Sequence, residues 1–350
     1  MRNGFTATLA SLVVLRAAAG PALSVTLHPS SDSPAVTSVL TNTGSEPLKL
    51  LKDPRTVLSD AKTESFTITS ANGSPDFTGI RVKYSPDYAI KKNDPASFMV
   101  LEPGQSREIV HNLAGTYNFA RTGAGEYKIT ALDTFSYVDN SGKVAFLKAT
   151  AGSSAFKLTK SLVPVRTSRT RSRIFRYRQI GPTFDNCDSE QQANIDEAIP
   201  AAELYIDGAL ASLDSGSSGS ERYISWFGEY DSSRSGAVRG HFDKIWGKST
   251  NTNYNCQCES VPEGTFAYVY PDQPGQVYLC DAFWNAPLTG TDSKAGTLVH
   301  EQTHFIENGG TQDYAYGQEK CRELAGTDPG TAIQNADSHE YFAENNPFQL

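Results

Sequence analysis

The sequence contains few histidine, methionine and tryptophan residues, 6, 2 and 3 respectively in 350 positions, and none of its 5 cysteines lies before residue 187. The first half of the chain therefore lacks the clustered side chains that build metal sites or disulfide frameworks. After the amino terminus, no apolar run approaches the roughly 18 residues that a membrane helix needs. The lack of a long apolar run excludes a membrane span. The lack of cysteines before residue 187 indicates that the catalytic or metal-binding residues lie in the second half of the chain.

Positive charge is scarce after residue 182, where 8 lysine and arginine residues stand against 26 aspartate and glutamate residues, a net charge of −18. The preceding residues carry a net charge of +10, so the whole chain has −8. Because an acidic surface repels nucleic acids and anionic membranes, we expect neither as a partner. The same charge favours cationic substrates.

The amino terminus, residues 1–19, has the pattern of a secretion signal. Arg2 precedes an apolar run that ends at Leu15, and three alanines at 17–19 supply the small residues of a cleavage site. A buried N-terminal strand is the alternative interpretation. The signal pattern predicts a secreted, extracellular protein.

Residues 20–165 have the features of an all-β unit. Short apolar or alternating runs lie at 24–27, 65–69, 80–84, 126–131 and 143–148, separated by turn sequences. This recurrence favours a β-sandwich. With no cysteine and only the scattered His28 and His111, the stretch offers no catalytic cluster. Asn72 begins a pattern for N-glycosylation.

Residues 166–182 form a linker with 6 arginines between Arg166 and Arg178. Such a run is most often a solvated segment, and a nucleic-acid patch is another interpretation. The sharp change of composition on either side favours a processing linker between a pro-domain, residues 20–165, and a mature domain, residues 183–350. We expect the basic linker to help hold the pro-segment, a partner before processing, against the acidic domain.

Residues 183–350 mix helical and extended patterns. A helix from Ser189, a hairpin of 265–270 and 276–279, and helices at 318–324 and 331–341 predict a mostly helical α+β domain with a small β-sheet. The predicted fold is therefore multidomain, with an all-β sandwich-like pro-domain followed by this α+β domain.

The cysteines of the second half have two interpretations. Cys187, Cys256, Cys258 and Cys280 are expected to form two disulfides, for which three connectivities exist, and a CxC zinc site is the competing possibility. The remaining Cys321 is expected to be a buried thiol.

One stretch carries recognisable chemistry: His300-Glu301-Gln302-Thr303-His304. Residues four apart in a helix differ by about 40° around the axis, so His300 and His304 can bind one Zn²⁺ from the same face. Glu301 lies beside them as a candidate base. A chance match within a structural helix is the alternative.

The residues after this helix offer a third ligand. Asn308-Gly309-Gly310 can reverse the chain, since glycine reaches backbone angles that other residues avoid. Asp313 can then return as an oxygen ligand, and Tyr316 could direct its hydroxyl to the same site. Three protein ligands leave a coordination position for water, as catalytic zinc requires.

These motifs resemble those of the aspzincins, the deuterolysin-type metallopeptidases. The His-Glu-x-x-His motif is followed by Gly310-Thr311-x-Asp313-x-x-Tyr316-Gly317. The cysteine spacing and the runs at 264–271 and 335–342 are most similar to the fungal peptidyl-Lys metalloendopeptidases.

The resemblance implies a catalytic Zn²⁺, one per domain, held by His300, His304 and Asp313. It implies that Glu301 is the base for attack by a zinc-bound water and that Tyr316 donates to the oxyanion. It also implies the disulfides Cys187–Cys256 and Cys258–Cys280. The predicted activity is that of a secreted zinc endopeptidase made as a pro-enzyme.

Asp337 and Glu340 are three residues apart, so they share a face of a helix. A solvated acidic face is the plain interpretation. The resemblance implies that both carboxylates bind a substrate lysine in the S1′ pocket, which predicts cleavage on the amino side of lysine in proteins and peptides. A deuterolysin-like protease of broader specificity and a non-catalytic extracellular zinc-containing binding protein are the alternatives.

Overall fold

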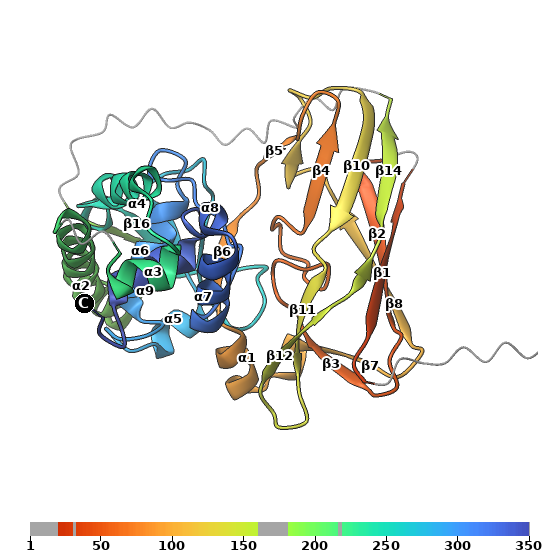
Figure 1. The fold of residues 1–350 in the computed structure, drawn as a ribbon, viewed down its shortest axis with the longest axis horizontal. Helices are drawn as coiled ribbons and strands as arrows, with labels where there is room; N and C mark the ends of the chain where they lie inside the picture. The colour runs from red at the N-terminus through yellow and green to blue at the C-terminus, as the bar shows by residue number, and fades with distance from the viewer. Residues whose placement is uncertain (1–19, 31–32, 160–180, 216–218, 350) are drawn as a thin grey trace, which may run out of the picture.

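A β-rich unit and a mainly helical unit lie side by side in the protein (Figure 1). The computed structural model describes residues 20–30, 33–159, 181–215 and 219–349. The predicted secretion signal and nearly all of the predicted linker lie outside these residues. Within the described residues, no helix is both long and apolar enough to cross a membrane.

The β-rich unit contains three larger sheets and a two-stranded ribbon. The strand orders are β13-β1-β2-β8, β14-β10-β4, β12-β11-β3-β7 and β5-β9. The strands are β1 (Leu23–Pro29), β2 (Ala35–Asn42), β3 (Leu48–Leu51), β4 (Phe66–Ser70), β5 (Asp76–Phe77), β7 (Phe98–Leu101), β8 (Ser106–Asn112), β9 (Tyr117–Asn118), β10 (Gly125–Ala131), β11 (Thr134–Val138), β12 (Val144–Lys148), β13 (Thr150–Ala151) and β14 (Ser153–Leu158).

These sheets share one hydrophobic core, which draws alternate residues from each strand. Val25 of β1, Leu40 of β2, Ile68 of β4 and Ile129 of β10 are all buried in it. The alternation of buried and exposed residues along β2 and β10 is the pattern of strands with one face on a core. The predicted strands of residues 20–165 agree with the structure, but the region is not all-β, because it also contains α1 (Pro86–Lys92) and η1 (Pro95–Ser97).

The helical unit has its own core, built from the inner faces of its helices and from a small sheet. Its helices are α2 (Ser189–Asp214), α3 (Glu221–Phe227), α4 (Ser232–Ile245), α5 (Asp281–Asn285), α6 (Lys294–His304), α7 (Gln318–Thr327), α8 (Pro329–Ala332) and α9 (Ala336–Glu344). The short helix η2 (Ser249–Asn251) belongs to the same unit. Helices α1 (Pro86–Lys92) and η1 (Pro95–Ser97) come from the first half of the chain, where they follow strand β6 (Arg81–Tyr84).

One predicted helix start was correct, and one predicted helix is interrupted. Helix α2 begins at Ser189 as predicted, and Asp188 and Gln191 form its capping box. The predicted helix at 331–341 is divided into α8 and α9, because Asn335 adopts an extended backbone conformation at the start of α9. The buried side-chain amide of Asn335 accepts hydrogen bonds from the loop at Tyr314 and Ala315.

The sheet of the helical unit has the order β15-β16-β18-β17-β6. It is formed by β15 (Thr183–Asp185), β16 (Asn253–Asn255), β17 (Thr265–Val269), β18 (Gln276–Leu279) and β6 (Arg81–Tyr84). Strand β6 comes from the β-rich half of the sequence and pairs antiparallel with β17. The prediction of a strand at 80–84 was correct, but its place in the other unit's sheet was not foreseen.

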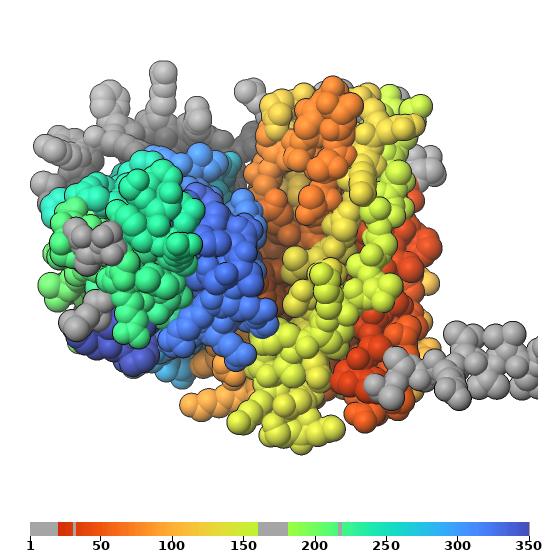
Figure 2. Space-filling model, viewed as in Figure 1, coloured from red at the N-terminus to blue at the C-terminus, as the bar shows by residue number. Residues whose placement is uncertain are grey.

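The two units touch along an extended face (Figure 2). Leu51, Val82 and Phe98 from the β-rich half share a buried cluster with Tyr268 and Tyr316 of the helical half. This cluster surrounds β6 and holds it at the edge of the sheet. The candidate functional residues lie directly beneath that strand.

Candidate metal centre and substrate pocket

Helix α6 carries the paired histidines through the centre of the helical unit. Ser293 caps the helix by accepting a hydrogen bond from the Gly296 N–H, and every residue of the helix is buried. A Cβ at Gly296 would lie 2.1 Å from the Glu344 Oε1 atom, so glycine permits close packing of α6 against α9. The helical spacing then places the His300 and His304 rings 4.8 Å apart.

The structure brings His300, His304 and Asp313 together. The Asp313 Oδ1 atom lies 3.2 Å from His300 Nε2 and 3.3 Å from His304 Nε2. All three atoms are buried and, among the described residues, none has a hydrogen-bond partner. Because buried polar atoms are nearly always paired, three unpaired atoms facing one point fit a bound cation. Two imidazole nitrogens and one carboxylate are a ligand set that suits zinc.

The other nitrogen of each imidazole is held by a specific neighbour. His304 Nδ1 lies 2.9 Å from the Thr311 carbonyl oxygen. His300 Nδ1 lies 2.9 Å from Asp337 Oδ1 and 3.1 Å from Glu340 Oε2. Acceptors at Nδ1 place the proton there and leave Nε2 free to bind a metal.

The electrostatics of the cluster favour a charged Asp313. Burial alone would raise the pKa of this carboxyl, but the neighbouring His304 and His300 imidazoles hold it well below its usual range. Burial lowers the pKa of His304, which favours its neutral form. A carboxylate and a neutral imidazole are the forms that coordinate a metal.

The loop that carries Asp313 is anchored to the start of α9. The Asn335 Oδ1 atom accepts hydrogen bonds from the Tyr314 N–H at 2.9 Å and the Ala315 N–H at 3.0 Å. Gln312 and Asn335 also form a parallel β-bridge. Asn335 thus fixes the loop, a role that the sequence pattern did not reveal.

Glu301 and Tyr316 lie on either side of a peptide group of β6. The Lys83 N–H donates to Glu301 Oε1 over 3.3 Å, and the Tyr316 hydroxyl donates to the Val82 carbonyl oxygen. Burial raises the pKa of Glu301 to about 8 and holds the pKa of Tyr316 well above its usual value. Tyr316 therefore remains a hydrogen-bond donor, and Glu301 is a group that can gain or release a proton near neutral pH.

The side chain of Lys83 enters a pocket lined by carboxylates. Its ammonium donates to Glu340 Oε1 and Oε2 over 2.6 and 2.7 Å and to Asp292 Oδ1 over 3.1 Å. Burial alone would lower the pKa of Lys83, but Glu340 and Asp292 raise it well above its usual value. The Lys83 side chain is therefore a charged ammonium that is only 1% exposed.

Asp337 and Glu340 occupy different parts of this region. The Asp337 carboxylate contacts His300, as above, and accepts from the Gly317 N–H over 2.8 Å. Glu340 bridges the His300 imidazole and the Lys83 ammonium. These contacts place Asp337 beside the candidate metal ligand His300 and Glu340 beside the Lys83 ammonium.

Sequence reasoning missed two pocket residues. Asp292 directly precedes the α6 cap and has φ 52, a left-handed conformation that aspartate tolerates better than most residues. The Tyr341 hydroxyl donates to Asp292 Oδ1 over 2.8 Å and orients it toward Lys83. An acidic residue one position before a helix cap is common, so no local signal marked Asp292.

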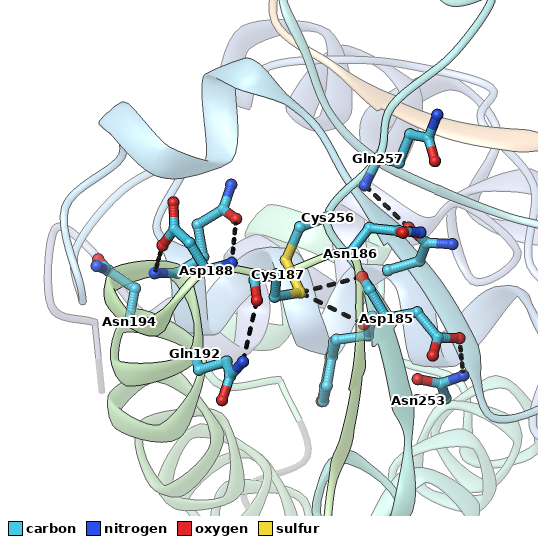
Figure 3. The surroundings of a disulfide bond; sticks show 12 residues. Asp185, Asn186, Cys187, Asp188, Gln192, Asn194, Asn253, Cys256 and Gln257 are labelled. Atoms are coloured by element: carbon cyan, nitrogen blue, oxygen red, sulfur yellow. Dashed lines mark hydrogen bonds between the residues drawn. A yellow bond between two sulfur atoms is a disulfide. The ribbon is translucent and has the colours of Figure 1, made fainter.

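The cysteines form two disulfides with the pairing that the family resemblance implies. Cys187–Cys256 ties the start of α2 to the end of β16 (Figure 3), and Cys258–Cys280 joins the segments on either side of β17 and β18. The free Cys321 is buried, and burial raises its pKa well above the usual value. Its thiol is therefore a packing group without nucleophilic character.

A buried cation site next to a titratable carboxylate, with a peptide group held between them, is the arrangement of a metal-dependent peptidase. The family model described as "Lysine-specific metallo-endopeptidase" matches residues 212–344. The chain is 43% identical to a peptidyl-Lys metalloendopeptidase of Grifola frondosa, with 90% of this chain and 88% of that protein covered. It is 35% identical to an extracellular protease of Aeromonas hydrophila, with 91% and 90% covered.

A solved zinc peptidase from Grifola frondosa is 49% identical and matches with a TM-score of 0.45, covering 47% of this chain and 100% of that one. The sequence comparisons establish that the chain belongs to the aspzincin family of metallopeptidases. It is a zinc-dependent metalloendopeptidase, which sets aside the non-catalytic alternative.

Proposed function

We propose that this metalloendopeptidase is secreted as a pro-enzyme and hydrolyses peptide bonds on the amino side of lysine. Residues 1–19 would be the secretion signal, 20–165 the pro-domain, 166–182 the processing linker and 183–350 the mature enzyme. The observation that carries the lysine specificity is the ammonium of Lys83, held by Glu340 and Asp292 while the N–H of the same residue faces Glu301.

The catalytic groups have complementary positions. Zinc held by His300, His304 and Asp313 would supply a Lewis acid and would lower the pKa of water. Glu301 accepts a proton from the attacking water and delivers it to the leaving amine, whose position is that of the Lys83 nitrogen. The Tyr316 hydroxyl stabilises the charge on the carbonyl oxygen, whose position is that of the Val82 oxygen.

The pocket suits lysine better than other residues. Glu340 offers two oxygens and Asp292 a third, which matches the three donors of an ammonium. The Phe266 ring lies 4.9 Å from the Lys83 ammonium nitrogen and covers the end of its stem. A planar guanidinium needs a broader, fork-shaped partner, so arginine is expected to bind poorly.

The names of relatives support the remaining parts of the proposal. The relatives from Grifola frondosa and Armillaria mellea are peptidyl-Lys metalloendopeptidases, the latter 42% identical over 317 residues. The relative from Aeromonas hydrophila is an extracellular protease, which agrees with a secreted protein. The acidic composition of residues 183–350, which attracts cationic substrates, also supports the lysine specificity.

The test is to digest unfolded proteins, such as reduced and alkylated serum proteins, with the processed enzyme. The digest is made with and without a zinc chelator. New amino termini should begin with lysine, and the chelator should remove them. A chelator-sensitive digest with no lysine preference would instead support the deuterolysin-like protease of broader specificity.

A further inference from the structure

Strand β6 lies at the site in the manner of a bound substrate. We propose that the chain's own Val82–Lys83 peptide bond is a substrate of the site and is hydrolysed within the same molecule. This inference rests on the proposed lysine specificity and adds a self-cleavage site inside the β-rich unit. Until that bond is cut, the strand excludes other substrates.

The direction and register of β6 are those of an extended peptide added to a sheet edge. It runs antiparallel to β17, and Val82 and Lys83 lie opposite Tyr268 and Ala267. The pairing continues beyond the strand, since the Ser85 N–H donates to the Gly264 carbonyl oxygen over 3.0 Å. Main-chain pairing of this kind supplies affinity, whereas side-chain pockets supply specificity.

Three consecutive groups of one dipeptide meet the three functional parts of the site. The Val82 carbonyl oxygen accepts from the Tyr316 hydroxyl, and the Lys83 N–H donates to Glu301. The Lys83 side chain ends at Glu340 and Asp292. A strand that merely covered the site would have no reason to satisfy the oxyanion donor, the base and the lysine pocket together.

Lys83 is also an unusual residue for its surroundings. Its side chain is 1% exposed, and burying an ammonium is unfavourable unless it is paired. Both of its partners belong to the helical unit, and the described residues of the β-rich unit supply no ion pair to it. The Lys83 side chain is therefore recognised by carboxylates of the helical unit and contributes nothing to the core of the β-rich unit.

Further contacts hold β6 and the loop that carries Tyr316 in place. The Val82 N–H donates to Asp313 Oδ2 over 3.0 Å. The Arg55 guanidinium lies 4.1 Å from the centre of the Tyr316 ring and donates to the Tyr314 carbonyl oxygen over 3.0 Å. These contacts keep the bond positioned, and effective concentration favours its cleavage within the molecule.

The reaction needs only water. The oxygen of water bonds to the Val82 carbonyl carbon as the Val82–Lys83 C–N bond breaks. Glu301 takes one proton from the water and returns it to the Lys83 nitrogen, and the second proton of the water passes from the new carboxyl group to the same amine. The products are therefore a Val82 carboxylate and a Lys83 ammonium. The new carboxylate lies beside Asp313 and Glu301, and the resulting repulsion favours departure of the strand.

The first experiment follows the zinc-loaded full-length chain by intact mass and amino-terminal sequencing. A fragment that begins at Lys83 should appear with a first-order rate that is independent of protein concentration. Lys83→Met, which retains the apolar stem, and Glu301→Gln should each reduce this cleavage at least tenfold. Lys92→Ala is the matched control, because Lys92 also pairs across the units, with Glu263 at 2.7 Å, but lies outside the pocket.

Two results of this experiment would overturn the inference. One is a preparation that cleaves added proteins before lysine but leaves Val82–Lys83 intact. The other is cleavage whose rate constant rises in proportion to protein concentration. If the processed enzyme shows no lysine preference on added proteins, the proposed function fails first, so the two failures are distinguishable.

The second experiment measures whether Lys83 occupies the carboxylate pocket, in a variant that cannot cleave the bond. In the Glu301→Gln background, the zinc-loaded chain should bind a fluorescent lysine-containing peptide at least tenfold more weakly than the same chain that also carries Lys83→Met. Circular dichroism checks that both chains are folded. Equal binding by two folded chains would show that Lys83 does not occupy the pocket and would overturn the inference.

Discussion

The ammonium of Lys83 lies 2.6 and 2.7 Å from the two carboxylate oxygens of Glu340, although the residues are 257 positions apart in the chain. Glu340 also lies 3.1 Å from His300, so one side chain connects the lysine pocket to a candidate metal ligand. This connection suggests that substrate recognition and metal binding are physically coupled at Glu340. Substitutions at individual residues separate the two roles.

Glu301→Gln should abolish turnover and leave zinc bound. The substitution removes the proton acceptor but not His300, His304 or Asp313, and loss of general acid–base catalysis costs about 10²–10⁴-fold in rate. Peptide hydrolysis and zinc content by atomic absorption are measured on the same processed sample. An active variant, or one that has lost its zinc, would contradict the assigned role.

Tyr316→Phe should lower kcat by about 10²–10³-fold with little change in KM, because a single oxyanion donor is removed. Tyr316 is buried, and phenylalanine keeps the ring that packs near Tyr84 and Arg55. Tyr314→Phe is the matched control, since that side chain is 46% exposed and should tolerate the change. Equal losses in both variants would point to a general disturbance of the loop.

Asp292→Asn and Asp337→Asn should have different effects. Asp292 contacts the ammonium, so its amide should weaken the preference for lysine and leave zinc affinity unchanged. Asp337 contacts His300, so its amide should reduce zinc affinity by about 10–100-fold. Product sequencing and zinc titration test the pair. An Asp337→Asn enzyme that keeps its zinc affinity but loses lysine preference would restore the pocket role that the family resemblance implies.

Acid should destabilise the helical unit through His241 and His339. His241 Nδ1 lies 3.0 Å from His339 Nε2, and burial lowers the pKa of His241 to about 4 and that of His339 to about 3. Lys244, His300 and His304 add weaker effects of the same sign. Because the unfolded chain takes up these protons first, stability is complete above pH about 6.5 and decreases as the pH falls toward the folded values.

The expected loss of unfolding free energy is on the order of 3 kcal/mol per histidine over this window. Denaturant unfolding of the metal-loaded protein between pH 7 and pH 5 would show the decline before most carboxylates titrate. A double variant with His241→Gln and His339→Gln should give a shallower slope. An unchanged slope would assign the acid sensitivity to other groups, of which His111, with a pKa lowered by burial to about 4, is the first to examine.

The local sequence was sufficient to predict the catalytic helix and to assign the chain to its family. His300, Glu301 and His304 meet because helical periodicity alone places them together, and Gly310, with φ 63, turns the chain back as glycine allows. The resemblance to the aspzincins and the need for zinc are confirmed by relatives that span most of the chain. The strands of the first half were also predictable from the sequence, because alternation of apolar residues is a local property.

Tertiary structure alone decided what lies opposite that helix. Pairing of β6 with β17 joins residues more than a hundred positions apart, and the strand's own sequence does not specify its partner. Asp292, Asn335 and Tyr341 acquire their roles only when α6, α9 and the Asp313 loop pack together. Periodicity predicts which side chains share a face of one element, whereas the site also depends on which elements face each other, and that is determined by the packing of the whole chain.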